Sequence, residues 1–147
     1  MKVKVAEASD MVLDYMVALA LGHNIVWDGI AYWISDLNTS KLIGSKWKAC
    51  GKPCGWSPSN YWEHGGSIID QERISCHPLH ISGTTESGAE VAVQNGWTCF
   101  YTPRLFWQSV RFRQAGPTLL IAALRCYVAS KLGEEVEVPD ELLKAQP

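Results

Sequence analysis

The segment from Gly116 to Val138, GPTLLIAALRCYVASKLGEEVEV, constrains the fold more than any other part of the chain. Pro117 favours the first turn of a helix, and Gly133 is typical of a helix end. Apolar residues recur between them at a helical spacing, and few side chains there are polar. The pattern predicts a helix from about Thr118 to Leu132 that is buried over most of its circumference. We expect it to be the central helix of the fold.

The composition indicates one folded domain covering residues 1–147. Hydrophobic residues make up 47% and charged residues 19% of the chain, a balance that argues against disorder. The net charge of -2 argues against partners such as extended nucleic acid or acidic membranes, which need a broad positive surface. No uninterrupted apolar run approaches the roughly 18 residues of a membrane span. We therefore expect no segment of the chain to span a membrane.

The N-terminal segment predicts a short strand followed by a second helix. Residues 1–5, MKVKV, alternate apolar and basic side chains, which is typical of an edge strand. In the following ASDMVLDYMVALALG, Ser9 or Asp10 is a favourable helix cap and Gly22 marks the helix end. Because its apolar residues share one face, we expect this helix to pack on the central one.

The middle of the chain predicts turns and short strands. Ser59 to His64 suits one helical turn, which Gly65-Gly66 ends, and residues 67–74 then suit a strand. Asn95-Gly96 is the best hairpin signal, joining strands at 90–94 and 97–101. Other extended segments are expected at 105–112 and around 136–138, with a terminal helical turn from Pro139. The fold class is therefore α+β: a small, mostly antiparallel sheet packed against two main helices, with long aromatic-rich loops.

The region from His23 to Cys54 lacks a regular pattern and mixes aromatic side chains with polar ones. Seven tryptophans occur in the chain, and four of them lie from Trp27 to Trp56. Most are expected to be structural, but an aromatic in such a stretch also suits the lining of a cleft. The same region holds the lysines Lys41, Lys46, Lys48 and Lys52. Two interpretations stay open for them: a solvated surface, or a binding loop for an anionic partner.

Metal binding and catalysis have weak support. The five cysteines, with no secretory leader, are most simply read as reduced thiols. Zinc ligation would use Cys50, Cys54, Cys76, His77 and His80, but the first pair is loosely spaced and Pro78 interrupts the second cluster. Glu63-His64, beside two glycines, has the groups for acid–base chemistry, but polar residues of an exposed turn are the better interpretation. We expect no metal, no cofactor and no catalytic residue, so the chain is read as leaning away from an enzyme.

Phosphate recognition is a further candidate at the start of the central helix. Free amides at Gly116 to Thr118 and the helix dipole favour an anion, and Arg111 and Arg113 lie just before them. No Walker lysine or GxGxxG motif accompanies them, so an ordinary helix start is the better interpretation. Within the helix itself, Arg125 is expected to be exposed and is the main side chain with a group that could bind a ligand.

Three segments together resemble the NinX-like proteins of tailed bacteriophages and prophages. They are the opening MKVKVAEASDMVLDYMVALALG, the central WSPSNYWEHGGSIIDQERI, and GPTLLIAALRCYVASKLGEEVEVPDELL near the end. The central signature corresponds to Trp56, Pro58, Ser59, Trp62, Gly65, Gly66, Ile69 and Arg73. The C-terminal signature corresponds to Pro117, Leu120, Ala122, Ala123, Arg125, Tyr127 and Gly133. The resemblance implies a phage accessory protein in the bacterial cytoplasm, and it implies no catalytic residue or cofactor.

The sequence thus leads to a functional hypothesis and an alternative. The first is non-enzymatic binding of a small anionic, nucleotide-like ligand, as in the sequestration of a host defence signal. The expected ligand-binding residues are Trp56, Ser59, Asn60, Trp62, His64, Arg73, Arg111 and Arg113. The alternative is a protein-interaction module that binds a host or phage protein. A homo-oligomer with a site between subunits is compatible with either.

Overall fold

The computed structural model describes residues 1–35, 41–43, 55–84, 90–103 and 111–145. Within these residues the chain forms helices and three small sheets whose strand pairs are all antiparallel. The expected α+β class is confirmed. The single small sheet of the sequence prediction is instead divided among three places in the fold.

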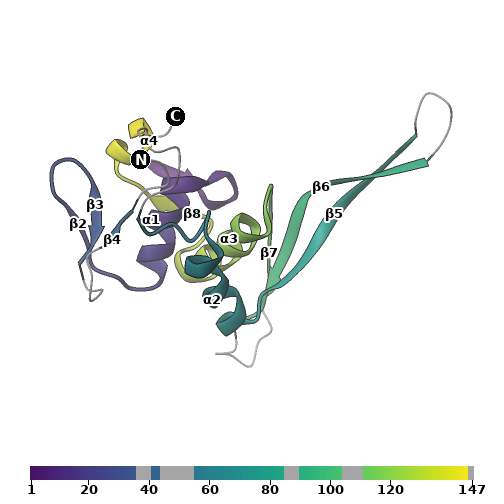
Figure 1. Cartoon of the computed structure of the whole chain (residues 1–147), viewed down its shortest axis with the longest axis horizontal. Helices are drawn as coiled ribbons and strands as arrows, with labels where there is room; N and C mark the ends of the chain where they lie inside the picture. Colours follow the sequence, from purple (N-terminus) through teal and green to yellow (C-terminus); the bar gives the residue numbers. More distant parts are fainter. Residues whose placement is uncertain (36–40, 44–54, 85–89, 104–110, 146–147) are drawn as a thin grey trace.

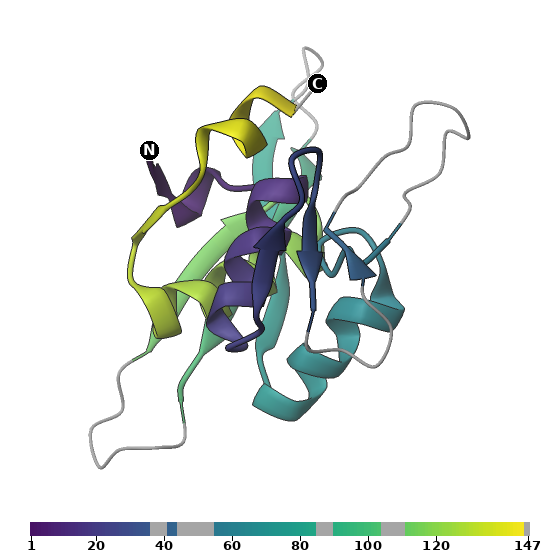
Figure 2. The same cartoon turned by 90° about the vertical axis from the view of Figure 1, so that its left-hand side faces the viewer.

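The central helix is α3 (Leu119–Leu132), which lies between α1 (Asp10–Ala20) and the largest sheet (Figure 1). That sheet has the order β5 (Ser75–Thr84), β6 (Glu90–Tyr101) and β7 (Phe112–Gly116). A second sheet of β2 (Ile25–Trp27), β3 (Tyr32–Ile34) and β4 (Lys41–Leu42) lies beside α1 (Figure 2). There Tyr15 of α1 meets Tyr32 edge to face, with ring centroids 5.5 Å apart.

The two ends of the chain meet in the third sheet. Strand β1 (Lys2–Lys4) pairs with β8 (Glu135–Glu137), and a 3-10 turn, η1 (Val5–Glu7), leads from β1 towards α1. The last helix, α4 (Asp140–Ala145), follows β8. The strand expected at 1–5, the extended segment around 136–138 and the terminal helical turn are thus confirmed.

The core is built mainly between α1 and α3. Leu13, Met16 and Val17 of α1 and Leu124 and Val128 of α3 are fully buried. Each such side chain contributes about 1.5–3 kcal/mol through its removal from water. The packing of the N-terminal helix on the central one is therefore as expected.

The boundaries of α3 agree with the sequence to within one residue. Thr118 caps the helix, since its Oγ1 accepts a hydrogen bond from the Ile121 amide at 3.2 Å. Pro117 therefore precedes the cap instead of occupying the first helical position. Gly133, with φ of +91°, ends the helix in a conformation that favours glycine.

The strand predicted at 67–74 is wrong, because residues Trp62–Glu72 form one helix, α2. The two glycines that suggested a turn lie inside it. A Cβ on Gly65 would lie 2.3 Å from the Pro58 carbonyl oxygen and 3.0 Å from Leu120 Cδ2. Gly65 is therefore needed for the close approach of α2 to the rest of the fold, and helix packing outweighs the local turn preference.

The predicted Asn95-Gly96 hairpin is also wrong, since β6 runs without interruption through both residues. Gly96 has φ of +95°, and a Cβ there would lie 2.5 Å from the Gly116 carbonyl oxygen. The glycine permits close approach of β7 and does not form a two-residue turn. Strands β5 and β6 instead form a long hairpin that extends beyond the rest of the fold (Figure 1).

The cysteines differ from the expectation of reduced thiols. Cys76 of β5 and Cys99 of β6 are direct partners in the strand register and form a disulfide. Cys126 of α3 is a buried free thiol. Cys50, Cys54 and most of the strand predicted at 105–112 lie outside the described residues, as do Lys46, Lys48 and Lys52.

None of the described helices combines the length and the apolar character that crossing a membrane requires.

Candidate functional site

The start of α2 is held by a buried carboxylate on α1. Asp14 is fully buried, and its Oδ2 accepts a hydrogen bond from Ser57 Oγ at 2.6 Å. Its Oδ1 accepts one from the Ser59 amide at 2.8 Å. Burial raises the pKa of Asp14 to about 7, although both hydrogen bonds act in the opposite direction. The 57–60 turn is thereby fixed to the core of the molecule.

Asn60 extends this polar network to the first turn of α1. Its Nδ2 donates to Ser57 Oγ at 2.9 Å and lies 3.3 Å from Asp10 Oδ1. Ser59 Oγ donates to the Asp10 carbonyl oxygen at 3.4 Å. Ser59 and Asn60, both expected to contact a ligand, therefore form part of the support beneath α2.

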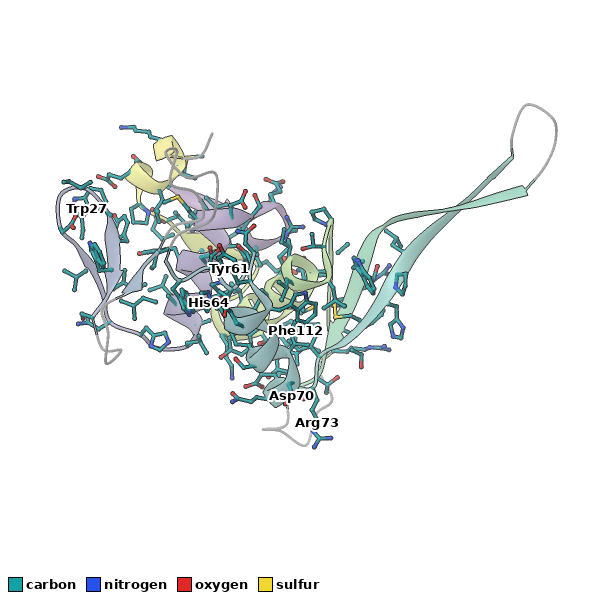
Figure 3. All side chains as sticks on the ribbon, in the orientation of Figure 1. Trp27, Tyr61, His64, Asp70, Arg73 and Phe112 are labelled. Carbon is teal, nitrogen blue, oxygen red and sulfur yellow. A yellow bond between two sulfur atoms is a disulfide. The ribbon has the colours of Figure 1, made fainter. Side chains whose placement is uncertain are left out.

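Trp56 and His64 also belong to this support. Trp56 is only 6% exposed, and its indole meets His23 edge to face within the core. His64 accepts a hydrogen bond from the Ser57 amide at its Nδ1, at 3.1 Å, and its ring contacts that of Tyr61. A neutral His64 with an accepting Nδ1 carries its proton on Nε2. The contacts of His64 fix the first turn of α2, where Figure 3 shows Tyr61 and His64 close to each other.

The outer surface of α2 forms a groove with a volume of about 680 Å³. Trp62 lies at the start of the groove and is 60% exposed; among the described large apolar residues, Ile30 and Met1 alone are more exposed. Arg73 follows the last turn of the helix, where its φ of +53° gives it a left-handed backbone conformation. The groove is lined by Trp62, Gly66, Ile69, Asp70, Gln71, Arg73 and Ile74.

Gly66 shapes this groove beside the indole. A Cβ at Gly66 would lie 3.0 Å from Trp62 Cε3, so the ring lies directly over the glycine backbone. Asp70 lies between Gly66 and Arg73 along the helix, and Figure 3 shows Asp70 and Arg73 together at its far end. An aromatic face, a carboxylate and a guanidinium thus share one open surface. This set suits a small ligand with both an aromatic and an anionic part.

Arg111 and Arg113 are not among the residues that line this groove. They lie beside Phe100 on the β5–β6–β7 sheet, with the guanidinium carbons 4.0 Å and 5.9 Å from the centre of its ring. Arg113 is the direct partner of Phe100 in the strand register. The structure therefore brings Trp62 and Arg73 together and places Arg111 and Arg113 on a separate surface.

The structure gives no support for a metal site in its described part, where no group of three or more His, Cys, Asp or Glu side chains is arranged around one point. Cys76 is bonded to Cys99, and the His77 ring lies against Phe100. Glu63, the residue paired with His64 in the acid–base candidate, is exposed.

Several residues of the site were missed by sequence reasoning. Ile69, Asp70 and Gln71 were assigned to a strand, so their common surface with Trp62 was not recognised. No role was predicted for Asp14 from the sequence. Its signal was present, since a single carboxylate among MVLDYMVALA needs buried donors from elsewhere in the fold.

The family model described as "Bacteriophage P22, NinX" matches residues 4–131. No curated protein sequence matches the chain. The matched region contains the buried Asp14 network, all of α2 with its groove, and nearly all of α3.

Proposed function

The chain belongs to the NinX family of bacteriophage P22, and from this membership and the α2 groove we propose that it is a phage accessory protein that binds a small anionic, nucleotide-like ligand. The observation that carries the proposal is the presence of Trp62 and Arg73 on one groove. Sequestration of a host signal molecule is the role that such binding would serve without catalysis.

The indole of Trp62 supports the aromatic part of this ligand. Tryptophan is a favourable stacking surface for a nucleobase, and such stacking contributes about 1–3 kcal/mol per base. Because 60% of Trp62 is exposed, the ring is available to a ligand without prior unfolding of the core. Because Gly66 has no side chain, the surface beside the Trp62 ring is left open for a ligand.

Arg73 supports the anionic part. A guanidinium favours phosphate through paired hydrogen bonds. The eleven residue steps from Trp62 to Arg73 correspond to about 16 Å of helix, so a ligand that contacts both carries its base and its phosphate at opposite ends. Asp70, between them, suits hydrogen bonds from sugar hydroxyls or a base amino group.

Isothermal titration calorimetry against a panel of nucleotides and cyclic nucleotides tests this proposal. We expect one class to bind, and Trp62→Ala to weaken that binding by about 5- to 150-fold. Trp27→Ala is the matched control, since Trp27 is another exposed tryptophan, at 41%, and does not line the groove. A folded sample that binds no member of the panel, or equal binding by Trp62→Ala, would overturn it.

A protein-interaction module is the second candidate, and the β2–β3 hairpin favours it. The Asp28 carboxylate accepts hydrogen bonds from the Ile30 and Ala31 amides, each at 2.7 Å, and from Trp33 Nε1 at 2.6 Å. These bonds hold the loop so that Ile30 is 88% exposed. A rigid apolar side chain of this kind is favourable for protein recognition. Capture of a partner from infected cells that is lost with Ile30→Asp would support this function over the first.

A further inference from the structure

A buried arginine on α3 lies in a cavity outside the α2 groove. Arg125 is only 9% exposed, which contradicts the expectation that it is an exposed side chain. Its Nε donates to the Ala8 carbonyl oxygen at 2.9 Å, and its Nη1 donates to the Ala115 carbonyl oxygen at 2.7 Å. The guanidinium therefore joins three segments: the start of α1, the end of β7 and α3.

These two bonds leave the guanidinium incompletely satisfied. The group has five N–H donors, and hydrogen bonds to two carbonyl oxygens account for only part of them. Within the described part of the chain, no carboxylate forms an ion pair with Arg125. Among the described residues, no Arg125 nitrogen is both buried and without a partner, so the donors that lack a protein acceptor remain accessible to solvent. An anion beside Arg125 would supply the missing partner.

The space for such an anion is present. A cavity of about 400 Å³ is lined by Arg125 together with Ala6, Leu79, Gln114, Ala115, Gly116 and Pro117. Gln114 adds a side-chain amide, and none of the lining residues in the described part of the chain is a carboxylate. Gly116 and Pro117 directly precede the Thr118 cap, so the cavity lies at the positive end of the α3 dipole. Among the described residues, the cavity and the α2 groove have no lining residue in common.

We propose that the cavity beside Arg125 is a second binding site, for a phosphate group, either as the free ion or on a small phosphorylated molecule. The planar guanidinium fork matches the paired oxygens of a phosphate. Arg125 then has two roles: its Nε and Nη1 bonds hold the fold together, and its remaining donors bind the ligand. The site is independent of the proposed nucleotide groove.

The experiment is an NMR titration of the nitrogen-15-labelled full chain with inorganic phosphate and, separately, glycerol 3-phosphate. Sodium chloride keeps the ionic strength constant, and the Arg125 Nε–H signal is followed. We expect saturable shifts of this signal with at least one of the two probes. Binding of the free ion alone would assign the site to inorganic phosphate, and binding of both would assign it to phosphate esters.

The variant that tests the site leaves Arg125 in place, because loss of its two structural bonds would affect folding. Ala115→Glu adds a carboxylate at an exposed lining position while the Ala115 carbonyl remains available to Arg125. It should weaken phosphate binding about tenfold or more through like-charge repulsion, whereas Ala115→Gln should retain affinity within about threefold. Trp62→Ala should leave phosphate binding unchanged. No saturable shift with either probe, or equal binding by Ala115→Glu, would overturn the proposal.

Discussion

Asp14 accepts a hydrogen bond of 2.6 Å from Ser57 Oγ, although 43 residues separate the two along the chain. The bond connects the buried face of α1 to the turn from which α2 begins. The exposed groove with Trp62 and Arg73 is thus attached to the core through a polar contact, in addition to apolar packing. The position of the candidate ligand site should therefore depend on a residue that no ligand contacts.

Replacement of Asp14 should show how much this contact stabilises the fold. Asp14→Ala leaves Ser57 Oγ and the Ser59 amide without their acceptor, and we expect a loss of about 1–3 kcal/mol in the free energy of unfolding. Asp14→Asn keeps one acceptor for the Ser59 amide and should cost about 1 kcal/mol or less. Urea unfolding of the three proteins measures the difference. If alanine and asparagine have the same effect, the hydrogen bonds are not the source of the stability.

The same residue predicts a pH dependence of stability. Burial raises the pKa of Asp14 in the folded protein from 3.8 to about 7, so the folded state retains this proton over a range in which the unfolded state releases it. The contribution is fully present below pH 3.8 and is lost as the pH rises through about 7. Relative to Asp14→Asn, the unmodified chain should lose stability between these limits. Unfolding titrations of both proteins at several pH values give the difference, and a constant difference would contradict the raised pKa.

The adjacent glycines of α2 should differ in their tolerance of alanine. Gly65→Ala places a Cβ 2.3 Å from the Pro58 carbonyl oxygen, so we expect a loss of more than about 2 kcal/mol. Gly66→Ala meets mainly the Trp62 ring, 3.0 Å away, which has an exposed side on which to move. There the gain in helix propensity, up to about 1 kcal/mol, should offset the contact. Thermal unfolding of both variants tests the contrast, and equal destabilisation would show that Gly66 is also required for packing.

Local patterns were sufficient for α1 and α3, because their apolar spacing and terminal residues agree with the tertiary structure. They were insufficient where distant segments determine the local conformation. Gly65 lies in a helix because of Pro58 and Leu120, and Gly96 lies in a strand because of the Gly116 carbonyl. Arg125 is buried where Ala8, 117 residues away in sequence, and Ala115 of β7 supply carbonyl oxygens.

The candidate site shows the same division. Trp62 and Arg73 were selected from the sequence for their chemistry, and the groove that contains both arises from a helix that was predicted as a turn and a strand. The residues between them, including Asp70, could not be assigned without the helix. Trp62, Gly66, Ile69, Asp70 and Arg73 share a surface because residues three or four apart lie on the same face of a helix, whereas in a strand successive side chains alternate between its two faces.

The disulfide between Cys76 and Cys99 predicts a redox-dependent stability. The cross-link closes a loop with a sequence separation of 23 residues, for which loss of unfolded-state entropy corresponds to about 3 kcal/mol. Reduction with a phosphine should therefore lower the free energy of unfolding by about this amount, and Cys76→Ser should lower it similarly while removing the effect of the reductant. Peptide mapping without reduction identifies the bond directly. If the sample contains the bond and reduction leaves the free energy of unfolding unchanged, the cross-link does not stabilise the folded state and the prediction is wrong.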